Sequence, residues 1–149
     1  MKKSKIDVAN YFMLIIVVNV LLHYFVPIKQ LLFFPYRYIG IVLFVLGWVP
    51  NFWYGIYFRK IKTSIPSKEE PKKFVTTGLF RISRNPIYLG MILALFGEAV
   101  FLGSLITFIL PILFFILINI LNVPFEEDTM EKRFGKKYLD YKKKVRRWV

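Results

Sequence analysis

The stretch RISRNPIYLG, residues 81–90, opens a long apolar run and combines groups that could hold an anion. Pro86 is suited to the first position of a helix and Asn85 is a strong N-cap residue, so a helix is predicted to begin here. The free backbone N–H groups of its first turn, beside Arg81 and Arg84, would form a site for a carboxylate or phosphate. The alternative is a plain helix cap with arginines at the membrane interface.

Small residues continue along this predicted helix. Tyr88 falls in the same first turn, and Gly90, Ala94 and Gly97 follow on one face. Such a face lets either a second helix backbone or a flat ligand approach closely. Both interpretations stay open at this point.

A second group that could do chemistry is the acidic run Glu126-Glu127-Asp128. Acids in the first turn of a helix complement its dipole, which is the ordinary explanation. These three, however, stand in a segment otherwise dominated by lysine. Carboxylates near a membrane surface could also hold ribose hydroxyls, an ammonium group or one of the arginines Arg81 and Arg84.

Glu98 and His23 are ionisable groups inside apolar runs. Glu98 lies about 18 Å along the helix from Pro86 by helical rise. Charged groups inside a membrane are functional candidates if they face the protein interior, where Glu98 could pair with His23 or position a substrate. Otherwise both lie near the outer interface and reach water. One histidine and no cysteine give no metal-binding pattern, so no metal is expected.

Long apolar blocks must position these groups. The chain has 149 residues, of which 56% are hydrophobic and 19% aromatic. An apolar block of 18 or more residues can cross a bilayer core of roughly 30 Å. Four blocks reach or approach this length, the third being the shortest: Val8–Val26, Tyr36–Phe58, Pro86–Leu102, and Ser104 to about Val123.

The net charge of +13 is distributed very unevenly over these four predicted helices. Of the 22 basic residues, only Lys29 and Arg37 fall on one side of the membrane. The positive-inside rule therefore places both termini in the cytoplasm. A basic surface facing lipid headgroups explains the charge without a nucleic-acid partner.

The segment after Pro124 changes to an amphipathic pattern of about twenty residues, with Gly135 in its middle. Apolar residues recur there every three to five positions, as in a helix lying along the cytoplasmic face. We therefore expect an all-α polytopic membrane protein with about four transmembrane helices and a C-terminal amphipathic cytoplasmic helix. Residues 1–149 are expected to form a single domain.

Two motifs in residues 74–149 resemble those of the integral-membrane methyltransferases related to isoprenylcysteine carboxyl methyltransferase and the phospholipid methyltransferases. The first motif precedes the hairpin of the third and fourth predicted helices, and the second follows it. The first consists of Gly78, Phe80, Arg81, Arg84, Asn85, Pro86, Tyr88 and Gly90; the second of Glu126, Glu127, Phe134, Gly135, Tyr138 and Tyr141, closing with Val145, Arg147 and Trp148. Asn85 departs from the family pattern, in which histidine is commoner, and asparagine cannot titrate near neutral pH.

The resemblance implies methyl transfer from S-adenosylmethionine to a lipophilic acceptor, with a cytoplasmic cofactor pocket. The acceptor could be the carboxylate of a prenylated thioether, a lipid amine or a small thiol. The other function considered is a non-enzymatic basic membrane protein that organises anionic lipids or a partner membrane protein. The composition suggests a prokaryotic source and hence the plasma membrane. The implied catalytic residues are Arg84 and Glu98, and the implied cofactor contacts are Arg81, Arg84, Asn85, Tyr88, Gly90, Glu126, Glu127, Tyr138 and Tyr141.

Overall fold

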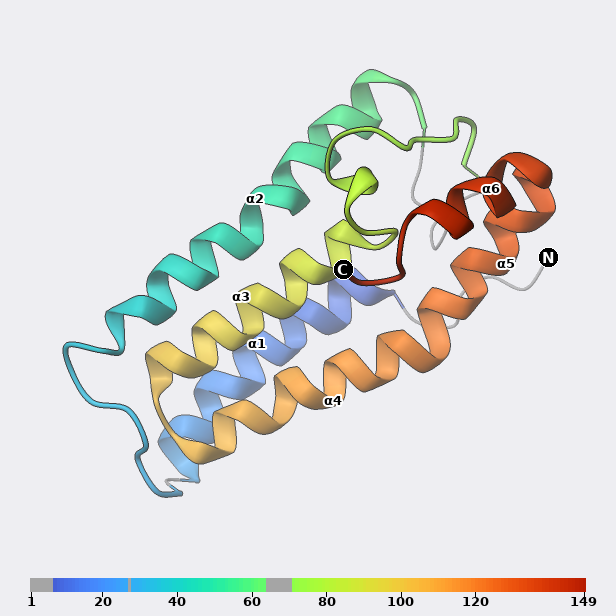
Figure 1. The fold of residues 1–149 in the computed structure, drawn as a ribbon. Helices are drawn as coiled ribbons and strands as arrows, with labels where there is room; N and C mark the ends of the chain where they lie inside the picture. The colour runs from blue at the N-terminus through green and yellow to red at the C-terminus, as the bar shows by residue number, and fades with distance from the viewer. Residues whose placement is uncertain (1–6, 27, 64–70) are drawn as a thin grey trace.

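The computed structural model describes residues 7–26, 28–63 and 71–149, and helices make up most of this part of the chain (Figure 1). The long helices lie side by side, and shorter elements gather at one end of them. In chain order the elements are α1 (Val8–Phe25), α2 (Tyr38–Lys60), the 3-10 helix η1 (Gly78–Arg81), α3 (Pro86–Leu102), the 3-10 helix η2 (Leu105–Phe108), α4 (Ile109–Leu117), the π-helix η3 (Ile118–Asn122), α5 (Val123–Phe134) and α6 (Lys136–Lys144).

Three helical stretches in the described residues are long and apolar enough to cross a membrane, namely Val8–Phe25, Tyr38–Lys60 and Leu105–Phe134. The fourth apolar helix, α3, has 17 residues, slightly fewer than the roughly 20 that a span usually needs. The predicted all-helical membrane architecture is confirmed. The bounds predicted for α3 agree with the structure at both ends.

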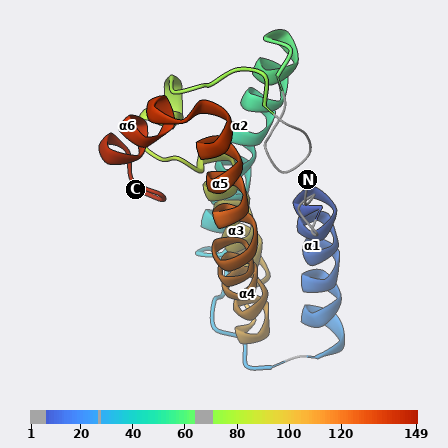
Figure 2. The same ribbon diagram turned by 90° about the vertical axis from the view of Figure 1, so that its right-hand side faces the viewer.

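The C-terminal part differs from the prediction. No break occurs at Pro124, because η2, α4, η3 and α5 form one continuous helix of 30 residues. Proline fits here because it occupies the start of α5, directly after the wider turn of the π-helix. The predicted amphipathic helix is instead divided at Gly135. This residue follows the last residue of α5 and has a φ of 51°, which a right-handed helix does not allow. Its second half, α6, turns back across the end of the bundle (Figure 2).

Close contact between α2 and α3 forms the centre of the bundle. Gly40 and Gly47 of α2 face Gly90 and Gly97 of α3, backbone against backbone. A Cβ atom on Gly47 would lie 2.6 Å from the Gly90 carbonyl oxygen, and one on Gly90 would lie 2.6 Å from the Gly47 carbonyl oxygen. The small-residue face of α3 therefore receives a second helix, which is one of the two alternatives the sequence left open.

Helix α1 packs at the side of this pair (Figure 2). Its residues Val8 and Phe12 are buried, and the Phe12 ring meets that of Trp48 edge to face at 5.3 Å. Most of its other large apolar side chains are exposed, as expected of a helix surrounded by lipid. The buried apolar core joins α1 to α3 and the fourth helical run through Val8, Phe12, Tyr88, Ala94, Leu95, Phe114, Ile118 and Val123.

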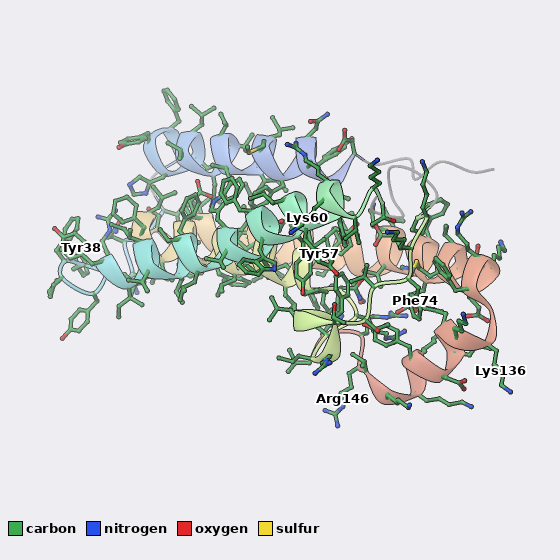
Figure 3. The ribbon with its side chains drawn as sticks, turned by 90° about the horizontal axis from the view of Figure 1, so that it is seen from above. Tyr38, Tyr57, Lys60, Phe74, Lys136 and Arg146 are labelled. Carbon is green, nitrogen blue, oxygen red and sulfur yellow. The ribbon has the colours of Figure 1, made fainter. Side chains whose placement is uncertain are left out.

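The two ends of the bundle differ in chemistry. Tyr38 lies at one end, whereas Phe74, Lys136 and Arg146 gather at the other (Figure 3). The Phe74 ring stacks on that of Phe134 at 5.1 Å, so the segment before η1 folds back onto the C-terminal helices. Both motif segments meet at this end, which we call the motif end.

Candidate functional site

The start of α3 is held by groups other than the predicted cap. The helix begins at Pro86 as expected, but the Asn85 side chain makes no capping bond, so that part of the prediction is wrong. The Asn85 Nδ2 instead donates to the carbonyl of Arg147 at 3.0 Å. The Asn85 backbone N–H donates to Ser83 Oγ, also at 3.0 Å. Asparagine here joins α3 to the C-terminal end of the chain.

Arg84 and Glu127 meet directly, although 43 positions separate them in the sequence. The Arg84 Nη1 lies 2.8 Å from Glu127 Oε1, and both side chains are nearly buried. Arg147 forms a forked pair with the same carboxylate, Nε to Oε1 at 3.2 Å and Nη2 to Oε2 at 2.9 Å. The Lys142 Nζ lies farther away, 3.9 Å from Oε2. Glu127 is therefore the anionic centre of a cationic cluster.

The Arg84 guanidinium has unused hydrogen-bonding capacity. Its side chain is 10% exposed. Within the described part of the chain, its Nε and Nη1 atoms are buried and have no acceptor in hydrogen-bond geometry. Its contact with Glu127 is thus an ion pair with poor hydrogen-bond angles. Buried donors usually have acceptors, so a guanidinium in this state is suited to an anionic ligand.

Glu126 belongs to a different environment from its neighbour. The Tyr88 hydroxyl donates a hydrogen bond to Glu126 Oε1, joining α3 to α5. Both residues are buried, and Tyr88 also forms part of the apolar core. The two adjacent glutamates therefore face different surroundings, Glu127 the cations and Glu126 the phenol at the top of the core.

Tyr138 and Tyr141 of the second motif pack against the Phe74 ring, edge to face. Burial and the Glu127 charge raise the pKa of Tyr138 to about 12, partly opposed by a hydrogen bond from Arg84 and its charge. Burial, followed by the neighbouring Tyr138, also raises the pKa of Tyr141. Both phenols therefore stay protonated at neutral pH, and the Tyr141 hydroxyl donates to the Phe80 carbonyl at 2.6 Å.

The loop before α3 is fixed by a residue of α2. The Leu79 N–H donates to the Tyr54 hydroxyl at 2.7 Å. Gly78 has a φ of +64°, and a Cβ on it would lie 2.8 Å from the same hydroxyl, so glycine suits this position. Arg81, at the end of η1, is exposed and is not among the cations that contact Glu127 in the described residues.

Two predicted site residues lie apart from the cluster. Gly90 packs against the backbone of α2 at Gly47, as described above, and so takes no part in the cluster. Glu98 is buried toward the opposite end of α3, where the Asn19 Nδ2 of α1 donates to its Oε2 at 3.3 Å. Of the roles considered for Glu98, pairing with His23 is not seen among the described residues, since His23 bonds Ser104 Oγ.

We expect Glu98→Gln to leave the affinity for S-adenosylhomocysteine unchanged, because Glu98 lies roughly 18 Å from the start of α3. The Asn19 Oδ1 is buried without a donor in the described residues, and a glutamine amide could supply one. Glu98→Gln should therefore keep or raise the melting temperature, whereas Glu98→Leu should lower stability by about 1–3 kcal/mol by leaving the Asn19 amide unpaired. Calorimetry and thermal unfolding in detergent measure the two effects. Equal melting temperatures for the Gln and Leu variants would contradict this assignment.

Sequence reasoning missed several residues that build the site. Arg147 was noted only as part of a closing motif, and Tyr54 and Ser83 were not noted at all. Their roles depend on which backbone groups lie opposite them, and spacing along the chain carries no signal for that. Arg147 alone offered a signal, as a basic residue beside an aromatic one at the end of the second motif.

Comparison with known proteins gives three findings. The family model described as phospholipid methyltransferase matches residues 36–137. An uncharacterized protein of Haemophilus influenzae is 36% identical over 63 residues, which are 42% of this chain and all of that protein. No solved structure matches significantly. The family match contains Arg84, Glu98 and the Glu126–Glu127 pair, and it ends before Tyr138, Tyr141 and Arg147.

Proposed function

Because the chain belongs to the phospholipid methyltransferase family, we propose that it transfers a methyl group from S-adenosylmethionine to a lipophilic acceptor within the membrane. The acceptor classes considered are a lipid amine, the carboxylate of a prenylated thioether and a small thiol. The donor site is proposed at the motif end, between the start of α3, α5 and α6.

The observation that carries this proposal is the buried Arg84 guanidinium with its unused donors. S-adenosylmethionine carries a carboxylate, an ammonium group, a ribose diol, a purine and a sulfonium. A carboxylate is the group that a guanidinium binds best, through charge-assisted hydrogen bonds. The donor's carboxylate is therefore assigned to Arg84, close to the first turn of α3.

The environments of the two glutamates suggest a division of roles. Glu127 already contacts Arg84 and Arg147, so its charge is compensated. Glu126, which accepts a hydrogen bond from the Tyr88 hydroxyl, is assigned to the donor's ammonium or ribose hydroxyls. The faces of Tyr138 and Tyr141 are suited to a cation such as sulfonium.

The donor supplies an electrophilic methyl group, and the chain supplies the arrangement around it. Arg84 and Glu126 would orient the donor from two elements, α3 and α5. The packed aromatic rings of buried Tyr138 and half-buried Phe74 and Tyr141 would exclude water. Catalysis of this kind depends on bringing acceptor and donor together in a dry site.

Calorimetric titration of the detergent-solubilised protein with S-adenosylhomocysteine tests the proposal. Saturable binding is expected, and Arg59→Ala, which removes an exposed charge outside both motifs, should bind equally well. If the parent protein does not bind, the methyltransferase proposal fails. A basic membrane protein that organises anionic lipids would then account better for the charge.

We also propose that the motif end faces the cytoplasm, because in the part of the chain that the structure describes every Lys and Arg except Lys29 and Arg37 belongs to segments at this end. The chain has no cysteine, so single cysteines report topology cleanly. Lys29 lies beside the start of η2, where its carbonyl accepts from the Leu105 N–H, and Asp140 belongs to α6 at the motif end, so Lys29→Cys and Asp140→Cys place exposed thiols at opposite ends of the bundle. In intact cells, an impermeant maleimide should label the first and reach the second only after permeabilisation. The reverse pattern would invert the proposed topology.

A further inference from the structure

The last residues of the chain, Val145–Trp148, cross the start of α3 and are here called the C-terminal strap (Figure 1). The Arg84 N–H donates to the Arg146 carbonyl at 3.0 Å. The Trp148 Nε1 donates to Asn119 Oδ1 in the π-helix η3 at 3.1 Å. The strap therefore joins the segment just before α3 to η3, the element that leads into α5.

Arg147 is attached to the site through both its side chain and its backbone. Its guanidinium holds both oxygens of Glu127 in the forked arrangement that fixes a carboxylate most firmly. Its carbonyl accepts from Ser83 Oγ at 3.2 Å and from Asn85 Nδ2 at 3.0 Å. One residue thus connects α5 to the segment that precedes α3.

The contacts that Arg147 makes with Glu127 determine whether the Arg84 guanidinium can bind a ligand. Glu127 is 8% exposed and has two guanidinium partners, and Arg147 provides the better geometry, with two hydrogen bonds. Because Arg147 makes the two hydrogen bonds to Glu127, Arg84 adds only an ion-pair contact through Nη1, and its Nε remains able to bind another anion. Without Arg147, the Glu127 carboxylate could turn onto the Arg84 guanidinium in hydrogen-bond geometry and use the donors that a ligand needs.

We propose that Arg147 is a positioning residue for the methyl donor, holding Glu127 so that Arg84 is free to bind the donor's carboxylate. The inference rests on the proposed function and deepens it, since it assigns a role to a residue beyond the 36–137 family match. Arg147 itself need not touch the donor.

The test uses two probes that differ in the group concerned. S-adenosylhomocysteine carries the carboxylate and ammonium, whereas 5′-methylthioadenosine has the same nucleoside thioether without either group. Arg147→Ala should weaken binding of S-adenosylhomocysteine by about tenfold, the effect of one charge-assisted hydrogen bond, and leave binding of 5′-methylthioadenosine unchanged. Arg147→Lys, which keeps the charge and loses the fork, should recover part of the affinity.

Arg146→Ala is the matched control. Arg146 is the exposed neighbour that contacts Arg84 through its backbone carbonyl, which alanine keeps, so both probes should bind as to the parent. Equal loss of both probes in Arg147→Ala would show a merely structural role and overturn the inference, as would unchanged binding of S-adenosylhomocysteine. Failure of the parent to bind either probe would instead remove the proposed function itself.

Discussion

Glu127→Ala should abolish detectable binding of S-adenosylhomocysteine and lower the stability of the protein by about 3–5 kcal/mol. The reason is that Glu127 holds both the nearly buried guanidinium of Arg84 and Arg147 of the strap, so its removal takes away the group that positions Arg84 in the site. Removing one partner of a buried ion pair leaves the other charge uncompensated in a poorly solvated place. Thermal unfolding in detergent measures the stability change, and calorimetry measures the binding.

Comparison with two other variants separates this effect from a general loss of charge. Asp128→Ala removes the adjacent acid, whose side chain is 56% exposed and pairs only with exposed Lys132 among the described residues, so little change is expected. Arg84→Ala leaves Glu127 paired with Arg147, so it should weaken binding by roughly ten- to a hundredfold with less effect on stability. A Glu127→Ala protein as stable as Asp128→Ala would refute the central place given to this carboxylate.

Gly47→Leu should separate α2 from α3 and prevent recovery of a folded protein. A side chain at Gly47 would meet the backbone of α3 at Gly90 and Ala94, and backbone atoms cannot move aside as a flexible side chain can. Inserting even small groups into a packed contact costs about 1–3 kcal/mol, and leucine adds four carbon atoms. Yield of monodisperse protein and its melting temperature report the outcome.

Gly55→Leu in the same helix is the control, because a Cβ on Gly55 meets no atom within 4 Å. That variant should fold as well as the parent, and leucine has the higher helix propensity. If both leucine variants behave alike, the close approach of the two backbones is not what holds α2 and α3 together.

The helices were the most predictable part of this molecule. Both ends of α3 were predicted correctly from the sequence, because the proline at its start and the glycine after its end are local signals. The division at Gly135 was harder, since a glycine inside a helical pattern is tolerated at a cost of about 1 kcal/mol and is also common just after a helix ends. The capping role of Asn85 failed because the Arg147 carbonyl, 62 positions away, competes for the same side chain.

The meeting of the two motifs was predictable from topology, because a tight hairpin returns the fourth helical run to the side where α3 begins. The direct Arg84–Glu127 pair confirms that the two segments are neighbours. The partner of Glu98 was not predictable, since it depends on how α1 packs, and α1 has an almost uniformly apolar sequence. The sequence shows that Asn19 is a polar residue in that helix, but it does not show that its side chain faces α3.

The π-helix η3 ends four residues before Glu126. In an α-helix each residue turns the chain by about 100°, so one residue more or fewer changes the direction of everything that follows. The π-turn accommodates one additional residue in a single turn. The part of the helix that follows it is therefore oriented so that Glu126 faces Tyr88 and Glu127 faces Arg84. A single-residue insertion after Asn122, beyond the one residue that the π-turn already accommodates, would swing both carboxylates away from α3 while leaving every site residue in the sequence. Chain length in this segment is consequently under the same constraint as the identity of the acids.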